Sequence, residues 1–362
     1  MKNSIFNKII NLCLWESSDK LFLELNPNGL SVDYNQDQSQ DLYLSELSRD
    51  KLEKEILNLN HGYSLNSGES LTFIETTSFG PKEITLTRLA GESKKYSLAI
   101  KKPLKTNYRL SELGLHHFLL KKLKNHLINK APKGLIIVAG EKATDRDKTI
   151  VALANLFKDK PYSLLNLNSQ LPLQDVLSLD LSWGQSLGLS APEISSLIRK
   201  HQPDVVISNL DKKELKTALL DLAQEDRLII AGINSPSLQQ ALSSLAEICP
   251  TSYLQENINL AIYQKFLPRL CPFCQAKQSL NKYEKNLLDD LQYRYNWKEL
   301  DKKSRQALGC KECLYSGSPG EIGLFEFLSF RDRNLSTANL IDDARKKYEL
   351  GLIDTTSLLS LN

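Results

Sequence analysis

Short runs of alternating hydrophobic and polar residues mark the first hundred positions of the chain. Alternation of this kind predicts β-strands, because every second side chain of a strand points to the same face of a sheet. The four clearest runs cover residues 21–25, 71–74, 84–87 and 96–100. Turn-forming residues separate them, and a stretch of helical periodicity covers about 45–59. We therefore predict a small α+β domain over residues 1–105.

A different pattern begins near residue 106, after a short polar linker that contains Pro103. Leucines at every fourth position from 115 to 127 predict a helix with a lysine-rich opposite face, which we interpret as solvated and not as a nucleic-acid contact. Apolar runs then alternate with helical stretches. The runs cover residues 135–139, 205–207 and 228–231, and the helical stretches cover about 147–157, 192–200 and 213–224. Apolar strands between helices are typical of a parallel sheet buried on both faces, so we predict an α/β core over residues 106–265.

Composition and charge set few limits on function. The 362 residues suffice for two or three domains, and the net charge of +3 indicates neither a nucleic-acid nor a membrane-surface partner. Polar residues interrupt the apolar positions of residues 1–15, which predicts an amphipathic helix and not an export signal. We expect this helix to pack on its own domain; docking on a partner or a membrane face is the alternative.

Four of the six cysteines carry the clearest chemical signal. Cys271 and Cys274 form one Cys-x-x-Cys pair, and Cys310 and Cys313 form a second, with 35 residues between the pairs. Two such pairs can place four thiolates in a tetrahedron, the closed ligand set of a structural Zn²⁺ site. Without an export signal, these cysteines are expected to be metal ligands in a cytoplasmic protein and not disulfides. We predict a zinc-binding segment over residues 266–325, followed by a helical segment over 326–362.

The order of these features resembles the ATPases that power type II secretion and type IV pilus assembly. The most specific resemblance lies in the cysteine pairs with their flanks, LCPFC at 270–274 and GCKEC at 309–313. Further stretches similar to the family are residues 17–24, 111–114, 134–140, 202–207 and 323–328. The resemblance covers nearly the whole chain, which is expected to lack the first N-terminal domain of longer members.

The resemblance implies a RecA-like P-loop NTPase core with a parallel sheet. A small α+β domain, the second N-terminal domain of the family, would precede this core, and the tetracysteine zinc segment and C-terminal helices would follow it. An active member would bind ATP and Mg²⁺. The expected assembly is a hexameric ring of this chain with itself or with an active paralogue. The implied partners are inner-membrane platform proteins of a secretion or pilus apparatus, and the implied location is cytoplasmic, peripheral to the inner membrane.

The expected nucleotide loop departs from the family pattern. A P-loop consists of glycine, four residues, then Gly-Lys-Ser/Thr, so that backbone N–H groups cradle the phosphates, the lysine reaches them and the hydroxyl binds magnesium. Gly140, Lys148 and Thr149 are the candidate nucleotide-binding residues, but Asp147 precedes the lysine and the loop is two residues too long. Three carboxylates in this loop would repel a triphosphate. We predict a polar turn that binds no nucleotide.

Other catalytic elements that the resemblance implies are also missing. The Walker B glutamate aligns with Leu210, and neighbouring Asp211 could replace it only if the register slips by one. The acidic box aligns with residues 164–168, which contain no carboxylate, and the two family histidines align with Arg227 and Asn234.

The N-terminal domain adds one more loss, because residues 31–43 contain no arginine or lysine that could reach a phosphate. Together these losses predict a pseudo-ATPase, with no catalytic residue assigned, that acts as a structural or regulatory subunit of a cytoplasmic motor. The alternative is an active or weak ATPase that uses Lys148 and Thr149, with Asp211 or Asp204 as the acid. A zinc-ribbon protein that binds nucleic acid is a third class, which the near-neutral charge disfavours.

Overall fold

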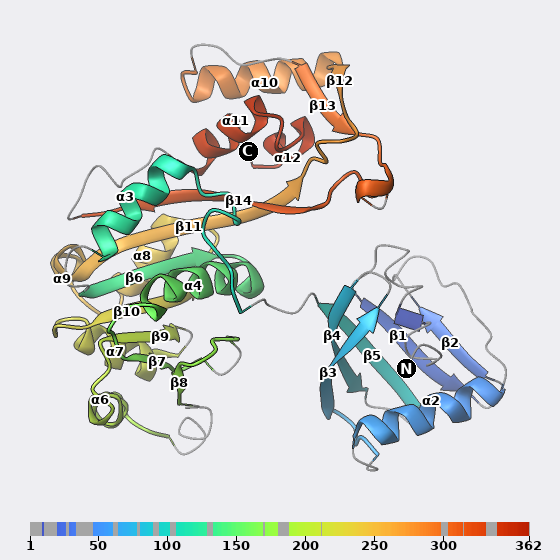
Figure 1. The fold of residues 1–362 in the computed structure, drawn as a ribbon, viewed down its shortest axis with the longest axis horizontal. Coiled ribbons are helices and arrows are strands. Elements are labelled where there is room, and N and C mark those ends of the chain that lie inside the picture. The colour runs from blue at the N-terminus through green and yellow to red at the C-terminus, as the bar shows by residue number, and fades with distance from the viewer. Residues whose placement is uncertain are drawn as a thin grey trace. The chain divides into compact units, whose positions relative to one another are not determined.

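The computed structural model consists of two units, residues 1–103 and 104–362, which are described separately below (Figure 1). It describes residues 9–10, 20–26, 29–33, 46–60, 64–77, 80–89, 94–101, 106–128, 133–168, 171–179, 188–210, 212–297, 303–313, 315–330 and 339–361. Asp211 and residues 34–45, part of the segment without arginine or lysine, lie outside the described residues. The predicted boundaries near 265 and 325 stay predictions.

The first unit is an antiparallel sheet with strand order β2-β1-β5-β4-β3 and one long helix. Its elements are β1 (Lys20–Asn26), β2 (Gly29–Asp33), α2 (Glu46–Leu59), β3 (Ser70–Thr77), β4 (Gly80–Arg88) and β5 (Lys94–Lys101). Leu52 and Ile56 of α2 pack in one core with inward-facing residues of β4 and β5. Ile9 and Ile10 belong to the same core, so the described part of the N-terminal segment packs on its own unit.

The second unit is built on a seven-stranded sheet with order β14-β11-β6-β10-β9-β7-β8. All neighbours in it are parallel except β11 and β14. The strands are β6 (Gly134–Gly140), β7 (Leu164–Asn166), β8 (Leu177–Ser178), β9 (Val205–Asn209), β10 (Leu228–Asn234), β11 (Ile258–Arg269) and β14 (Gly320–Leu328). Every residue of β6 is buried, as a central parallel strand requires. The predicted α/β core with a mostly parallel sheet is therefore confirmed.

Helices cover both faces of this sheet. Successive residues of β6 alternate between two cores, with Leu135 and Ile137 in one and Ile136 and Val138 in the other. One face carries α3 (His117–Ile128) and α4 (Ala143–Lys158); the other carries α6 (Ala191–Lys200), α7 (Lys213–Leu222), α8 (Leu238–Ala246) and α9 (Thr251–Asn257). None of the helices within the described ranges combines the length and the apolar character that crossing a bilayer requires.

Helix α4 begins four residues earlier than the sequence pattern predicts. It starts at Ala143 and not near residue 147, so only Glu141 and Lys142 connect it to β6. Residues 141–158 contain neither glycine nor proline, and therefore nothing in the segment opposes helix formation once its apolar face packs on the sheet.

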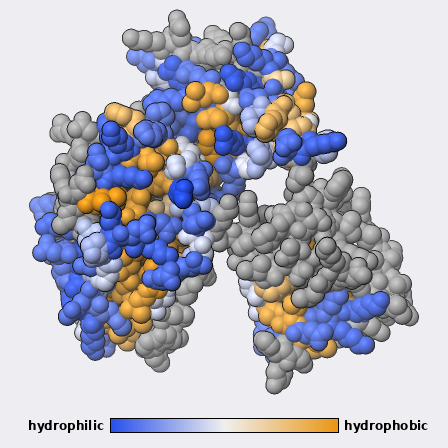
Figure 2. Space-filling model, viewed as in Figure 1, coloured by the Kyte–Doolittle hydropathy of each residue, from blue (hydrophilic) through white to orange (hydrophobic). Residues whose placement is uncertain are grey.

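The segment that contains the cysteines folds with the C-terminal helices. Its elements are β12 (Gln275–Ser279), α10 (Lys282–Arg294), β13 (Lys303–Ala307), η1 (Lys311–Cys313), α11 (Leu340–Glu349) and α12 (Thr355–Leu359). The helices α10, α11 and α12 share a core in which Leu291, Trp297, Tyr348 and Leu358 are buried. Figure 1 shows these elements in orange and red at one end of the unit. Figure 2 shows apolar residues in patches among the hydrophilic residues of this unit.

Candidate functional site

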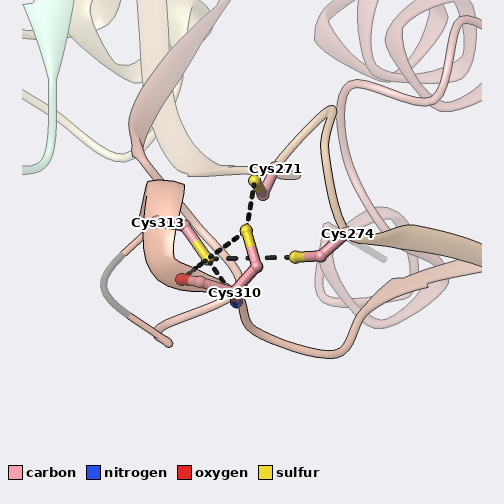
Figure 3. A group of neighbouring side chains, drawn as sticks. All are labelled: Cys271, Cys274, Cys310 and Cys313. Carbon is pink, nitrogen blue, oxygen red and sulfur yellow. Dashed lines mark hydrogen bonds between the residues drawn. The ribbon is translucent and has the colours of Figure 1, made fainter.

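The two cysteine pairs meet at one point of the structure (Figure 3). Cys271 and Cys274 lie in the turn between β11 and β12, and Cys310 and Cys313 lie at η1. All four sulfur atoms lie within 4.8 Å of one another. The Sγ–Sγ distances are 3.9 Å for Cys271 to Cys310, 3.8 Å for Cys274 to Cys313 and 3.8 Å for Cys310 to Cys313.

These distances fit one tetrahedral metal ion. Zinc with Zn–S bonds of about 2.3 Å would hold its four sulfurs about 3.8 Å apart, whereas a disulfide requires about 2.05 Å. The backbone supports the arrangement: Cys310 N–H donates to Cys313 Sγ at 3.2 Å, and Gly309 has φ +90° with Tyr315 O only 2.6 Å from its Cβ position. The four cysteines can therefore hold a metal ion, and its identity as zinc stays a prediction.

The expected nucleotide loop is replaced by the first turns of α4. The helical hydrogen bond from Arg146 N–H to Lys142 O, at 3.2 Å, shows that the helix is already formed there. Residues 143–148, which would have to curve around a phosphate group, thus have helical geometry, and only two residues precede them after β6. From Arg146 onward the backbone N–H groups donate to the preceding turn and cannot cradle a ligand, and only the N–H groups of residues 143–145 lack a partner within the helix.

Lys148 lies against carboxylates of the protein itself. Its Nζ is 2.6 Å from Glu321 Oε2 on β14 and 3.0 Å from Asp145 Oδ1, and it lies 4.7 Å from the centre of the Phe266 ring. Desolvation acts to lower the pKa of Lys148, but the hydrogen bonds and charges of Glu321 and Asp145 outweigh it and raise the pKa above its ordinary value. The ammonium is therefore charged at neutral pH and already has two anionic partners.

The other two nucleotide-binding candidates do not join Lys148 in a common pocket. Thr149 is fully buried between α4 and the sheet, and its Oγ1 has no hydrogen-bond partner among the described residues. Gly140 ends β6, and Gln264 O of β11 lies 3.2 Å from its Cβ position. The three residues are thus near in sequence but lie in different surroundings.

Other positions that align with catalytic elements of the family take part in packing or in hydrogen bonds within the protein. Leu210 is buried in the core on the far side of the sheet from α4, and its neighbour Asp211 lies outside the described residues. In the stretch aligned with the acidic box, Asn166 Oδ1 accepts a hydrogen bond from Asn168 N–H at 3.0 Å and so closes a turn. Arg227 pairs with Glu225 at 2.8 Å, immediately before β10.

Sequence reasoning missed three residues around the start of α4. Glu321 and Phe266 surround the ammonium of Lys148, and Arg146 is buried below the helix. Glu321 lies 173 positions from Lys148, so no local pattern could link the two. Arg146 is evident in the sequence as a basic residue between Asp145 and Asp147, but its burial depends on how α4 packs.

Comparisons with known proteins bear on the family. No protein-family model matches the chain. The type IV pilus assembly ATPase TfpB of Acinetobacter baylyi is 19% identical over 237 residues, which cover 63% of this chain and 39% of TfpB. The type II secretion system protein E of Klebsiella pneumoniae is 21% identical over 235 residues, which cover 63% of this chain and 44% of that protein. The matches thus span less than half the length of these curated relatives.

Solved structures show the same relationship in the fold. The Legionella pneumophila ATPase DotB aligns with a TM-score of 0.61 at 12% identity, over 98% of this chain and 94% of DotB. The pilus retraction motor PilT with bound ADP aligns with a TM-score of 0.58 at 14% identity, over 98% of this chain and 96% of PilT. The resemblance inferred from the cysteine pairs and strand motifs is therefore confirmed: the chain is related to the secretion and pilus assembly ATPases and has their fold.

Proposed function

We propose that this homologue of secretion and pilus motor ATPases does not hydrolyse ATP and acts as a structural or regulatory subunit of such a motor. The observation that carries the proposal is the start of α4 at Ala143, with only two residues between it and the end of β6. A P-loop needs a longer, glycine-containing turn at this point to surround the phosphates with N–H groups. The helical segment provides no such turn.

The charges at the start of α4 support the same function. To reach a phosphate, Lys148 would have to leave two carboxylates that lie within 3.0 Å of its ammonium. A triphosphate placed there would also meet Asp145 and Glu321 as like charges. A negatively charged ligand would therefore replace interactions that the protein already makes internally.

The alternative is an ATPase in which Lys148 and Thr149 act with Asp204 or Asp211. Asp204 lies before β9, and its carboxylate accepts hydrogen bonds from Ser163 N–H at 2.7 Å and from Ser163 Oγ at 2.9 Å. Because α4 starts at the carboxyl end of the parallel strands, Asp204 lies at the opposite end of β9, roughly 16 Å away along the strand. Asp211 is therefore the acid on which this alternative depends.

The cysteine site and the relatives suggest how the subunit would be used. We assign the four cysteines a structural Zn²⁺, since a closed tetrahedral shell leaves no position for a reacting water. By analogy with the relatives, the partners would be platform proteins of a secretion or pilus apparatus. The subunit would join a hexameric ring with itself or an active paralogue, in the cytoplasm and peripheral to the inner membrane.

Calorimetric titration of the purified chain with a non-hydrolysable ATP analogue and Mg²⁺ tests the proposal, together with an ATP hydrolysis assay. We expect no binding heat up to millimolar nucleotide and no phosphate release. Lys148→Ala and the exposed Lys142→Ala provide a matched pair of variants with the same charge change. Hydrolysis that Lys148→Ala abolishes and Lys142→Ala leaves intact would overturn the proposal in favour of the active enzyme.

A further inference from the structure

A row of polar residues and glycines crosses four neighbouring strands on the face of the sheet that α4 covers. The row is staggered: Gln264 on β11 lies beside Gly140 on β6, whereas Gly232 on β10 pairs with Asn209 on β9 two positions before the level of Gly140. The alternate residues before them in each strand pack in the core that contains α4, so the four residues face this helix. The apolar surface of the sheet thus ends in a polar strip beneath the first turns of α4.

The side chain of Arg146 enters this strip. Arg146 follows Gly140 by six positions, the spacing that a P-loop gives its lysine, and it is only 2% exposed. Its Nε lies 2.6 Å from the point where a Cβ at position 232 would stand, and Asn209 Oδ1 lies 2.5 Å from the same point. Only glycine at position 232 leaves room for both groups, so the guanidinium lies directly over β10.

Several polar atoms of Arg146, of its helix and of the strip have unused hydrogen-bonding capacity. Within the described part of the chain, Nε and Nη1 of Arg146 have no hydrogen-bond partner, and neither do Asn209 Oδ1, Thr149 Oγ1 or the two amide atoms of Gln264. A buried guanidinium without partners is strongly unfavourable, whereas donors and acceptors in one buried strip can satisfy each other through a buried water. The unpaired oxygen atoms can thus act as acceptors for the Arg146 guanidinium, a cation that belongs to the protein itself.

We propose that Arg146 is a resident cation of this polar strip, filling the space over Gly232 with its guanidinium. This inference rests on the proposed function and explains how a nucleotide-free core is sealed without a metal ion or a phosphate. It leads to a chemical expectation about a variant that lacks the Arg146 side chain. Removal of the side chain should leave a polar cavity with the shape of a guanidinium ion, and free guanidinium should bind there.

The test is the thermal stability of full-length Arg146→Ala in the presence of about 20 mM guanidinium chloride, a concentration at which its denaturing effect is negligible. We expect Tm to fall by at least about 4 °C relative to the natural chain, and guanidinium, but not sodium chloride or urea, to restore a large part of that loss. Lys142→Ala, an exposed charge change at the same helix end, should keep its Tm and show no response. Gly232→Ala should lower Tm without rescue, because its methyl group would clash with Arg146 and Asn209 while Arg146 is still present and leaves no cavity for free guanidinium. Should Arg146→Ala fail to fold, Arg146→Lys replaces it. Its ammonium keeps the charge and part of the volume but not the planar guanidinium, so we expect a smaller loss in Tm and no response to guanidinium; a Tm equal to that of the natural chain would refute the proposal.

Equal stability of Arg146→Ala and Lys142→Ala, or an equal response of both to guanidinium, would refute the resident cation. A parallel titration with the Mg²⁺–ATP analogue separates this failure from that of the proposed function. If the natural chain binds the nucleotide analogue and Arg146→Ala does not, Arg146 is a phosphate contact and both proposals are wrong. If the natural chain binds no nucleotide and guanidinium does not restore the Tm of Arg146→Ala, only the resident-cation proposal is refuted.

Discussion

The ammonium of Lys148 and the carboxylate of Glu321 lie 2.6 Å apart, although 173 positions separate the two residues in the chain. Glu321 lies near the start of β14, which pairs with β11, and Phe266 of β11 lies beneath the same ammonium. The lysine that the sequence offers to a phosphate thus ties α4 to the antiparallel edge of the sheet.

Glu321→Gln should weaken this tie without unfolding the chain. The Glu321 side chain is 52% exposed and Lys148 keeps Asp145 as a partner, so solvent screening limits the expected loss in unfolding free energy to about 1 kcal/mol or less. Urea denaturation followed by circular dichroism measures it. Glu312→Gln removes an equal charge from an exposed position of η1 and is expected to change stability less. Identical effects of the two variants would mean that the ion pair contributes nothing.

The contribution of Lys148 should also depend on pH in a definite direction. Its pKa is raised in the folded protein, because the charges of Glu321 and Asp145 outweigh desolvation. The stabilisation is therefore fully present below the ordinary lysine pKa of about 10.4 and is lost as pH rises through the higher folded value. The difference in stability between the natural chain and Glu321→Gln should stay constant from about pH 7 to pH 9 and shrink only above about pH 10.4. A difference that vanished below pH 9 would contradict the assignment of a charged ammonium.

The sequence predicted those elements whose signal is local. The strands β6, β9 and β10 lie in a sheet covered on both faces, so each contains a continuous apolar run and was recognised without knowledge of its neighbours. The cysteine quartet was recognised because each pair is a local motif, although β12 and β13 beside it were not predicted. These two strands, QAKQS and KSRQA, have no apolar face on which a pattern could be read.

The start of α4 could not be predicted correctly because the family resemblance suggested a loop there. Helix propensity from Ala143 onward and packing on the sheet determine the structure, and both favour helix. The contacts of Lys148 and Arg146 could not be predicted for another reason. Glu321 meets Lys148 only through the pairing of β11 with β14, and Arg146 meets Gly232 only after α4 has packed on the sheet.

The purified chain should contain about one zinc per molecule, as elemental analysis can determine. Cys274→Ser removes one of four ligands and should release most of the metal, because three thiolates bind zinc more weakly than four. Cys249→Ser is the matched control, since this thiol is partly buried, donates to Leu245 O at 3.4 Å and takes no part in the quartet. Full zinc content in Cys274→Ser, or loss of zinc in both variants, would count against the site.

The hydrogen bond from Trp297 Nε1 to Asp342 Oδ1, at 2.7 Å, should stabilise the part of the second unit that contains the cysteines. Trp297 is buried in the core formed with α11, and the Arg345 guanidinium lies 5.3 Å from its ring centre. Asp342→Ala leaves the indole N–H without its partner and should cost about 1–2 kcal/mol in urea denaturation, whereas Asp342→Asn keeps an acceptor and should cost less. Tyr293→Ala, at a side chain that is 92% exposed, should change stability by less than about 0.5 kcal/mol. Equal losses for Asp342→Ala and Asp342→Asn would show that charge and not the hydrogen bond matters.

Asp147→Gly introduces the glycine that the nucleotide loop lacks before Lys148, yet it should not create a nucleotide site. Position 147 lies in the second turn of α4, where glycine costs about 1 kcal/mol of helix stability. Only two residues would still separate the helix from β6, Lys148 would still pair with Glu321, and Arg146 would still fill the strip over Gly232. Denaturation should therefore show a modest loss, and titration with Mg²⁺ and an ATP analogue should show no binding. If Asp147→Gly bound nucleotide at concentrations below millimolar, Asp147 alone would keep the segment helical. A single substitution would then be enough for this fold to form a phosphate-binding loop.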